Sequence, residues 1–205
     1  MQVWKRWMLL VRYGWDRIFH PRSRADELFK LCQRFLLEAS VQELSPEERE
    51  LATAMKGLRE KLIQSYGIVY ACSSCAKGCI LPHGRWDGGF CCSGNTEDIF
   101  SPLEIAAIKA SGTKVSDLQP PKAPHAGCAF RGPQGCNLQP EHRPNLCISY
   151  ICNDLSRELA RSQRLDTVEG LGAELTEHML AFKHLRQERL DQEEWERLDA
   201  LIPSE

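Results

Sequence analysis

The chain has 205 residues, and 42% of them are hydrophobic, which is enough for the core of one domain with or without helical extensions. Its formal net charge is −2, whereas domains that bind nucleic acid usually carry a clear basic excess. We therefore expect no nucleic-acid partner.

The charge is distributed unevenly along the chain. Residues 1–24 contain six Lys and Arg against one Asp, and residues 153–205 contain seven Lys and Arg against thirteen Asp and Glu. Within residues 1–20 the basic side chains are mixed with three tryptophans and other apolar residues. This mixture suits weak contact with a membrane surface or an acidic partner, and packing on the domain itself is the favoured alternative.

The N-terminal sequence matches neither an export signal nor a membrane anchor. Its longest apolar run, WMLLV, ends at Arg12 and falls short of a typical signal-peptide core of about 7–15 residues. No stretch approaches the roughly 18–20 apolar residues of a spanning helix. We expect a cytoplasmic protein whose cysteines are reduced thiols.

Residues 25–39 are predicted to form the first helix of the domain. The spacing of its apolar residues predicts one buried face, made of Leu28, Phe29, Cys32, Phe35 and Leu36. A lone thiol within such a face behaves as a small core hydrophobe, so Cys32 is left out of the candidate site.

A second helix is predicted to begin after Ser45, where Pro46 suits the first helical position and Glu48 completes a capping box. Gly67 ends it. Its buried face is predicted to contain Leu51, Met55, Leu58, Leu62 and Tyr66.

The same start signal recurs at Ser101, and Gly112 ends a short third helix. Residues 112–144 are rich in Pro and Gly and are predicted to be ordered loop. The tail is predicted to be helical, to restart at Asp191 and to pack on the N-terminal helices. Its predicted apolar face contains Leu171, Leu175, Met179, Phe182 and Leu185.

Nine of the ten cysteines lie between Cys72 and Cys152. In a reducing compartment such density points to metal or thiol chemistry rather than to disulfides. The first group includes a C-x2-C knuckle, a spacing that lets two thiolates converge on one ion. The candidate ligands of this group are Cys72, Cys75, Cys79, Cys91 and Cys92.

The second group of candidate ligands contains Cys128, Cys136, Cys147 and Cys152. Arg143 and Pro144 lead into Cys147. Two roles are open for Arg143: its guanidinium donates hydrogen bonds to a thiolate or a bound sulfide, or it ties a loop carbonyl.

The ordered set of cysteines resembles the zinc- or iron-chelating CxxCxxCC family, also called YkgJ-like, over roughly residues 72–152. The family's opening C-x2-C is similar to Cys72 and Cys75, and its double cysteine is similar to Cys91 and Cys92. Its later part is similar to a matching set in this chain, which contains Cys128, Cys136, Arg143, Pro144 and Cys147.

Two features depart from the family pattern. Fifteen residues separate Cys75 from Cys91 where the family has a compact spacing, and Cys79 and Cys152 are additional. The resemblance implies metal chelation, with an iron–sulfur cluster and zinc both open.

Ligand counting and spacing favour iron over zinc. Two four-thiolate sites use eight of the nine cysteines, whereas one site uses four. Structural zinc commonly takes two knuckles and only one is present here, while iron–sulfur clusters accept irregular spacing. A thiol-redox protein with a Cys72–Cys75 couple is the third alternative, although no βαβ context accompanies it.

The sequence therefore predicts a mostly α-helical protein whose helices bracket an irregular, metal-organised, cysteine-rich centre. An N-terminal helical segment (1–70) precedes the cysteine-cluster module (71–153), and a helical tail (154–205) follows. One or two iron–sulfur centres, of the 4Fe–4S type, are expected to serve redox or modification chemistry with an unidentified protein or redox partner. The alternative is a zinc-stabilised interaction protein without catalysis.

Overall fold

The fold is taken from a computed structural model. It describes residues 24–38, 43–69, 96–122, 128–132 and 135–201. All five cysteines of the first group and the basic, aromatic segment 1–20 lie outside the described residues.

The described residues are mostly helical, which confirms the predicted class at that level. The helices are α2 (Arg24–Leu37), α3 (Pro46–Tyr66), α5 (Thr96–Ile99), α6 (Pro102–Ala110), α7 (Asn145–Ser149), α8 (Asn153–Arg161) and α9 (Leu165–Asp199). Two two-residue strands, β1 (Arg131–Gly132) and β2 (Gly135–Cys136), form an antiparallel hairpin, and short 3-10 turns are η2 (Val115–Asp117) and η3 (Pro140–His142).

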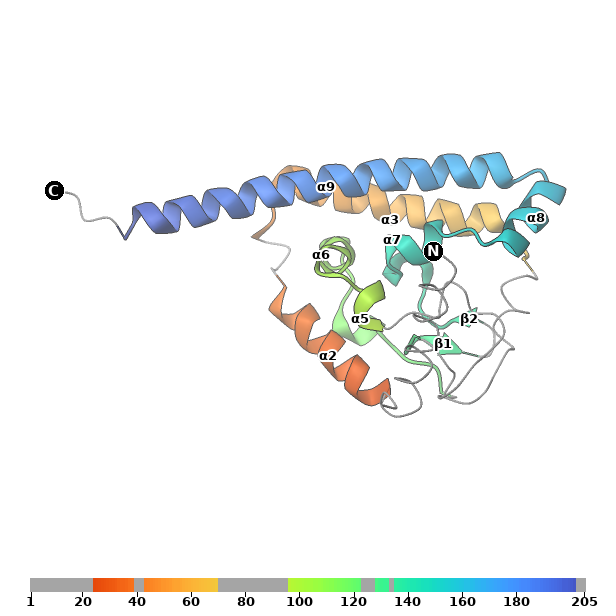
Figure 1. Ribbon diagram of the computed structural model, residues 1–205, viewed down its shortest axis with the longest axis horizontal. Helices are drawn as coiled ribbons and strands as arrows, with labels where there is room; N and C mark the ends of the chain where they lie inside the picture. The colour runs from red at the N-terminus through yellow and green to blue at the C-terminus, as the bar shows by residue number, and fades with distance from the viewer. Residues whose placement is uncertain (1–23, 39–42, 70–95, 123–127, 133–134, 202–205) are drawn as a thin grey trace, which may run out of the picture.

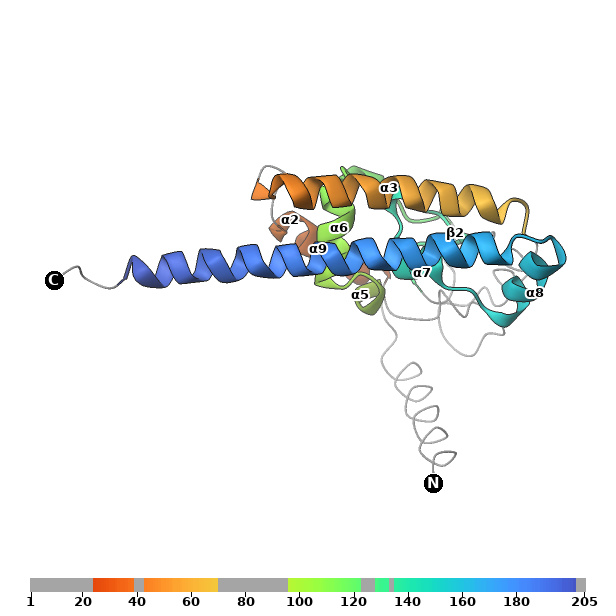
Figure 2. The same cartoon turned by 90° about the horizontal axis from the view of Figure 1, so that it is seen from above.

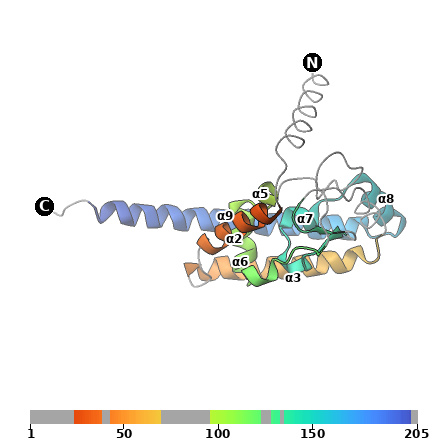
Figure 3. The same ribbon diagram turned by 90° about the horizontal axis from the view of Figure 1, so that it is seen from below.

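Helices α3 and α9 run side by side and form the scaffold on which the other helices pack (Figures 1 and 2). The shorter helices α2, α5, α6 and α7 lie on one side of this pair (Figures 1 and 3). None of the described helices is long and apolar enough to cross a membrane.

Helix α3 begins and ends where its sequence predicts. The Glu48 backbone N–H donates to the Ser45 hydroxyl at 3.1 Å, and the Ser45 N–H donates to the Glu48 carboxylate at 2.7 Å, so the capping box is formed. Gly67 ends the helix with a φ of 59°. This positive φ favours glycine, and the end of the Arg164 side chain occupies the space where a Cβ would lie.

The predicted restart of the tail helix at Asp191 is wrong. The helix is continuous from Leu165 to Asp199, because no Pro or Gly interrupts it near that point and polar pairs four residues apart support it there. Gln187 donates to Asp191 at 2.7 Å, and Gln192 donates to Glu196 at 2.8 Å.

Helix α9 packs on α3 through a stripe with a seven-residue repeat. Val168, Leu175 and Phe182 are buried at that spacing, which is two helical turns. The next position of the repeat, Arg189, instead donates to the buried carboxylate of Glu48 at 2.9 Å. Beyond this pair the last turns of α9 project past the start of α3 (Figures 1 and 2).

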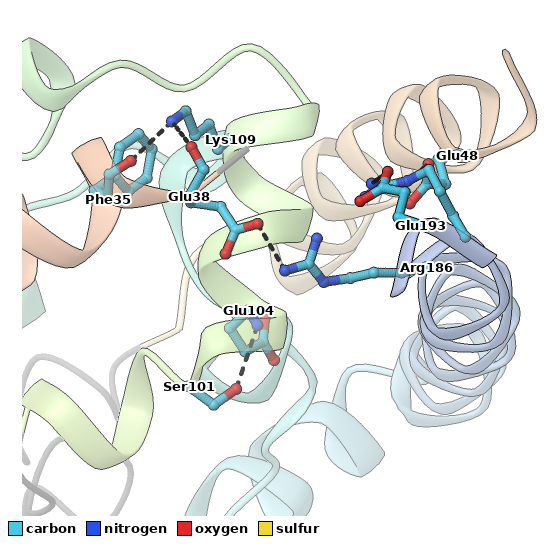
Figure 4. A network of polar contacts seen from close by, with 9 residues as sticks. Phe35, Glu38, Glu48, Ser101, Glu104, Lys109, Arg186 and Glu193 are labelled. Carbon is cyan, nitrogen blue, oxygen red and sulfur yellow. Dashed lines mark hydrogen bonds and ion pairs between the residues drawn. The ribbon is translucent and has the colours of Figure 1, made fainter. Parts of the chain in front are cut away.

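A second set of polar contacts joins α2 to α6 and α9. The Arg186 guanidinium pairs with Glu38 at 2.7 Å (Figure 4). The Lys109 ammonium of α6 donates to the backbone carbonyls of Phe35, at 2.9 Å, and Glu38. The C-terminal end of α2 is therefore held by cations from two other helices, and the Lys109 ammonium complements its orphan carbonyls.

The predicted buried face of α2 is wrong in part. Leu31 and Phe35 are buried, but Phe29 and Leu36 are 63% and 70% exposed, and Cys32 is half-buried. Apolar residues occur on two sides of this helix, and the side that packs is the one facing α5, α6 and η2. Periodicity alone does not identify which of two apolar faces has a neighbour.

Helix α6 has the predicted start and end. The Glu104 N–H donates to the Ser101 hydroxyl at 3.2 Å (Figure 4), and Gly112 adopts a φ of 93° after the last turn. The Glu104 side chain does not complete a capping box. Its carboxylate accepts from the backbone N–H groups of Asn145, at 2.9 Å, and Leu146, at 3.3 Å, and so caps α7.

The core of the fold contains a buried cation, Arg59. This α3 side chain is fully buried. Its guanidinium donates to the Asn145 side-chain oxygen at 2.9 Å, to the Glu141 carbonyl at 2.7 Å and to the Ser111 hydroxyl at 3.1 Å. Burial lowers the pKa of Arg59 to about 10, and the Glu104 carboxylate opposes that shift, so the guanidinium stays charged at neutral pH.

We predict that Arg59→Ala lowers the free energy of unfolding by about 3–5 kcal/mol, because it leaves the Asn145 side-chain oxygen and the Glu141 carbonyl without their donor and removes the cation that faces Glu104. Urea titration followed by circular dichroism measures the change. Arg157, an exposed arginine of α8 that pairs with Asp154, is the control. Arg157→Ala should change stability by less than about 0.5 kcal/mol. Equal effects of the two substitutions would contradict a special role for Arg59.

Candidate metal centre

Three of the four second-group cysteines meet at one hydrophobic cluster. Cys128 is buried within it, and Cys136 and Cys147 pack against it half-buried. We call it the cysteine-side cluster; its buried members are Leu31, Phe35, Ile99, Phe100, Ile105, Ile108, Leu118, Cys128, Phe130 and Leu138. Thiols that are widely spaced in sequence are therefore gathered on one side of the helical scaffold.

The β1–β2 pair connects Cys128, which precedes β1, with Cys136, which lies in β2. The Arg131 N–H donates to the Cys128 carbonyl at 2.9 Å, and the Asn137 N–H donates to the Phe130 carbonyl at 2.8 Å. Gly135 adopts a φ of 110°, which favours glycine where the second strand begins. The two thiols are close enough that negative charge on Cys136 raises the pKa of Cys128.

Cys147 is positioned by the residues that precede it. Arg143 donates from Nε to the Leu138 carbonyl at 2.7 Å and from Nη2 to the Cys136 carbonyl at 3.3 Å. These contacts correspond to the loop-tying role, one of the two open for this arginine. Asn145 then anchors the start of α7 on Arg59 and Glu104, so Cys147 follows in a fixed helical turn.

Thr96, which the sequence pattern did not single out, links three segments around Cys128. Its buried hydroxyl donates to the Glu27 carboxylate of α2 and accepts from the Ala129 backbone N–H at 3.0 Å. The same oxygen lies 3.9 Å from the Cys128 sulfur. Nothing in the local sequence marks this residue, because its partners come from distant parts of the chain.

Burial dominates the chemistry of Cys128. It raises the pKa of the thiol to about 12, and the Phe130 N–H and the Thr96 hydroxyl lower it only in part. The bare thiol is therefore neutral at pH 7. A metal cation at the sulfur reverses this preference, because it replaces the proton and stabilises the thiolate.

Cys152 lies apart from these three thiols in its packing. It occupies the residue before α8 and packs, half-buried, on the other hydrophobic cluster, which is built mainly by α3 and α9. Cys32 lies half-buried on α2 and belongs to neither of the two hydrophobic clusters found among the described residues. The structure thus groups Cys128, Cys136 and Cys147 and sets Cys152 against a different part of the core.

The described cysteines do not by themselves make a complete metal site. No three His, Cys, Asp or Glu side chains among the described residues form a group ready to hold a metal ion. The three thiols on the cysteine-side cluster are soft donors of the kind that zinc and iron–sulfur clusters take. A complete four-ligand centre requires a donor from outside those ranges, where all five first-group cysteines lie.

Comparisons of the chain with protein-family models, with curated proteins and with solved structures give no match. The likeness to the CxxCxxCC family therefore rests on the cysteine pattern itself.

We predict that Thr96→Val destabilises the fold by about 1–3 kcal/mol, because the Ala129 N–H and the Glu27 carboxylate lose a buried partner. Thr96→Ser keeps the hydroxyl and is the matched control. Urea denaturation of the two variants and the parent measures the difference. A Val variant as stable as the Ser variant would show that the hydroxyl does not hold this segment.

Proposed function

We propose that this chain is a metal-binding protein in which cysteine thiolates hold one or two iron–sulfur centres used for redox or modification chemistry. One observation supports this most directly. Three candidate ligands, delivered by a loop, a strand and a helix, converge on the same buried cluster. The described cysteine-bearing residues, 128–132 and 135–152, also contain only short regular elements, as expected where a metal supplies order that packing does not.

The surroundings of the three thiols favour an iron–sulfur centre over zinc. Aromatic and aliphatic side chains, including Phe100 and Phe130 with ring centroids 5.4 Å apart, form the cluster on which the thiols pack. Such a shell limits access of water and thereby tunes a redox potential. A structural zinc site has less need of this insulation.

The second candidate is a zinc-stabilised interaction protein, which one feature of α9 favours. The last turns of this helix project from the fold and expose Trp195, Leu198 and Leu201, with Trp195 65% exposed. Apolar side chains on a projecting, acidic helix are typical of a surface that binds a partner. In that case the metal replaces a missing core and takes no part in catalysis.

The state of the thiols bears on the cellular compartment in which the protein works. Reduced thiols require a reducing compartment, so we place the protein in the cytoplasm with a protein or redox partner. We also propose that segment 1–20 makes weak contact with a membrane surface. Retention of the full chain on anionic vesicles in a flotation assay supports it, and loss of binding after deletion of residues 1–20 locates it.

Anaerobic purification followed by a visible spectrum and metal analysis tests the proposed function. Brown protein with about four iron and four acid-labile sulfide per centre supports the iron–sulfur proposal. Colourless protein with one or two zinc ions supports the second candidate. A folded, metal-free preparation that cannot be loaded with either metal overturns both.

We predict that Cys136→Ser and Cys147→Ser each lower the metal content of the purified protein by at least about half, since each removes a thiolate ligand. Cys32→Ser is the matched control, because this half-buried thiol lies on α2 and outside the set. Iron, sulfide and zinc are quantified per chain for all three variants. Full metal content in both site variants would contradict the assignment of these ligands.

A further inference from the structure

Helix α2 has an apolar face that is exposed in the part of the chain that the structure describes. Phe29, Leu36 and Leu37 are exposed on it, and the half-buried Cys32 lies between them. Their spacing places them along one side of the helix, away from the side that packs on α5, α6 and η2. A helix that is apolar on two sides is normally buried on both, so this face is suited to a second neighbour.

An acidic surface begins where α2 ends. Glu38, just after this helix, pairs with Arg186 of α9 (Figure 4). From Arg186 the helix α9 continues to Asp199, which is about 20 Å at the usual rise per residue (Figure 1). Residues 190–201 contain five acidic side chains and one arginine, together with the exposed Trp195. The surface is thus apolar along α2 and acidic beyond its C-terminal end.

Segment 1–20 has the complementary composition. Its placement lies outside the described residues, and it ends only a few residues before α2 begins at Arg24. Its sequence has an apolar stripe with alternating spacings of four and three residues, which predicts one helical face. The stripe contains Trp4, Met8, Val11, Trp15 and Ile18. The basic side chains lie off the stripe and are Lys5, Arg6, Arg12 and Arg17.

We propose that residues 1–20 form an amphipathic helix that folds back on the exposed face of α2 in the same chain. Pro21 ends the predicted helix, so only a short connection remains before Arg24. Helices joined by about two to five residues form an antiparallel hairpin. The apolar stripe of the segment then covers Phe29 and Leu36.

The length of the segment brings its basic end to α9. A helix of residues 1–20 is about 30 Å long, whereas α2, with 14 residues, is about 21 Å long. The first turns of the segment, including Lys5 and Arg6, therefore extend beyond α2. They do so at the end of the fold toward which the last turns of α9 also run (Figures 1 and 3). Opposite charges meet there, which favours this arrangement over the pairing of two acidic α9 ends from two copies.

Docking on α2 is independent of the metal centre, and it bears on the membrane contact proposed above. The apolar stripe of segment 1–20 cannot face α2 and a membrane at the same time. The docked segment is therefore withheld from a membrane, and contact with vesicles requires its release.

Hydrogen–deuterium exchange of the full chain, read from peptides of residues 1–20, tests the docking. The α2-face variant combines Phe29→Gln with Leu36→Gln, two side chains that are exposed in the described structure. Amides of segment 1–20 should exchange about 10-fold more slowly in the parent than in this variant, because the variant lacks the face that holds the segment. Ile68→Gln, at an exposed residue just after α3, is the matched control and should behave like the parent.

A second variant tests the acidic surface. Glu194→Lys combined with Glu196→Lys should speed exchange of segment 1–20 by about 3-fold, since it places cations opposite Lys5 and Arg6. Glu169→Lys combined with Glu177→Lys makes the same charge change at exposed residues in the first half of α9 and should leave the rate unchanged.

The exchange rates also identify the other occupants. Amides of segment 1–20 that exchange equally fast in the parent and in the α2-face variant would overturn the proposal. Protection that disappears on dilution, together with a dimer seen by light scattering, contradicts docking within one chain and identifies a second copy on α2.

Vesicle flotation separates docking from membrane contact. Release of the segment should make retention of the α2-face variant on anionic vesicles stronger than that of the parent. Equal and measurable retention of the two proteins contradicts docking. Retention of neither defeats only the membrane contact, and the exchange rates then decide the docking.

Discussion

The fold depends on the buried guanidinium of Arg59. Its three donors reach Asn145, Glu141 and Ser111, which belong to α7, η3 and the end of α6. The scaffold helix α3 is thereby joined to the turn η3, which follows the strand that carries Cys136, and to the helix that carries Cys147. Because an unpaired charge in this position is costly, the three contacts form together and fix the relative placement of these segments. The irregular cysteine-bearing chain thus has a rigid base before any metal binds.

Features determined by neighbouring residues were predictable from the sequence. The caps at Ser45 and Ser101 and the stops at Gly67 and Gly112 act within one helical turn, and all four were confirmed. Features determined by distant residues were not. The buried face of α2 is set by α5, α6 and η2, so the burial of Phe29 and Leu36 was predicted wrongly. The Glu104 side chain caps α7, some forty residues later in the chain, which no local pattern indicates.

The candidate site was predictable to a similar extent. Cysteine density identified Cys128, Cys136 and Cys147, and the structure brings all three to one cluster. The same pattern could not show that Cys152 packs against the α3–α9 side of the core, since its neighbours are remote in sequence. It also did not single out Thr96, whose role follows from its burial and its hydrogen bonds to distant segments. The sequence thus identifies candidate donors, and the fold determines which of them are neighbours.

X-ray absorption at the metal edge of the anaerobically purified protein tests the central claim, that thiolates hold the metal, most directly. We predict a first coordination shell dominated by sulfur at about 2.3 Å. At the iron edge, an iron–iron shell beyond the sulfur would identify a cluster. At the zinc edge, a sulfur shell alone would fit the second candidate. A first shell made mainly of nitrogen or oxygen at about 2.0–2.2 Å would contradict the account.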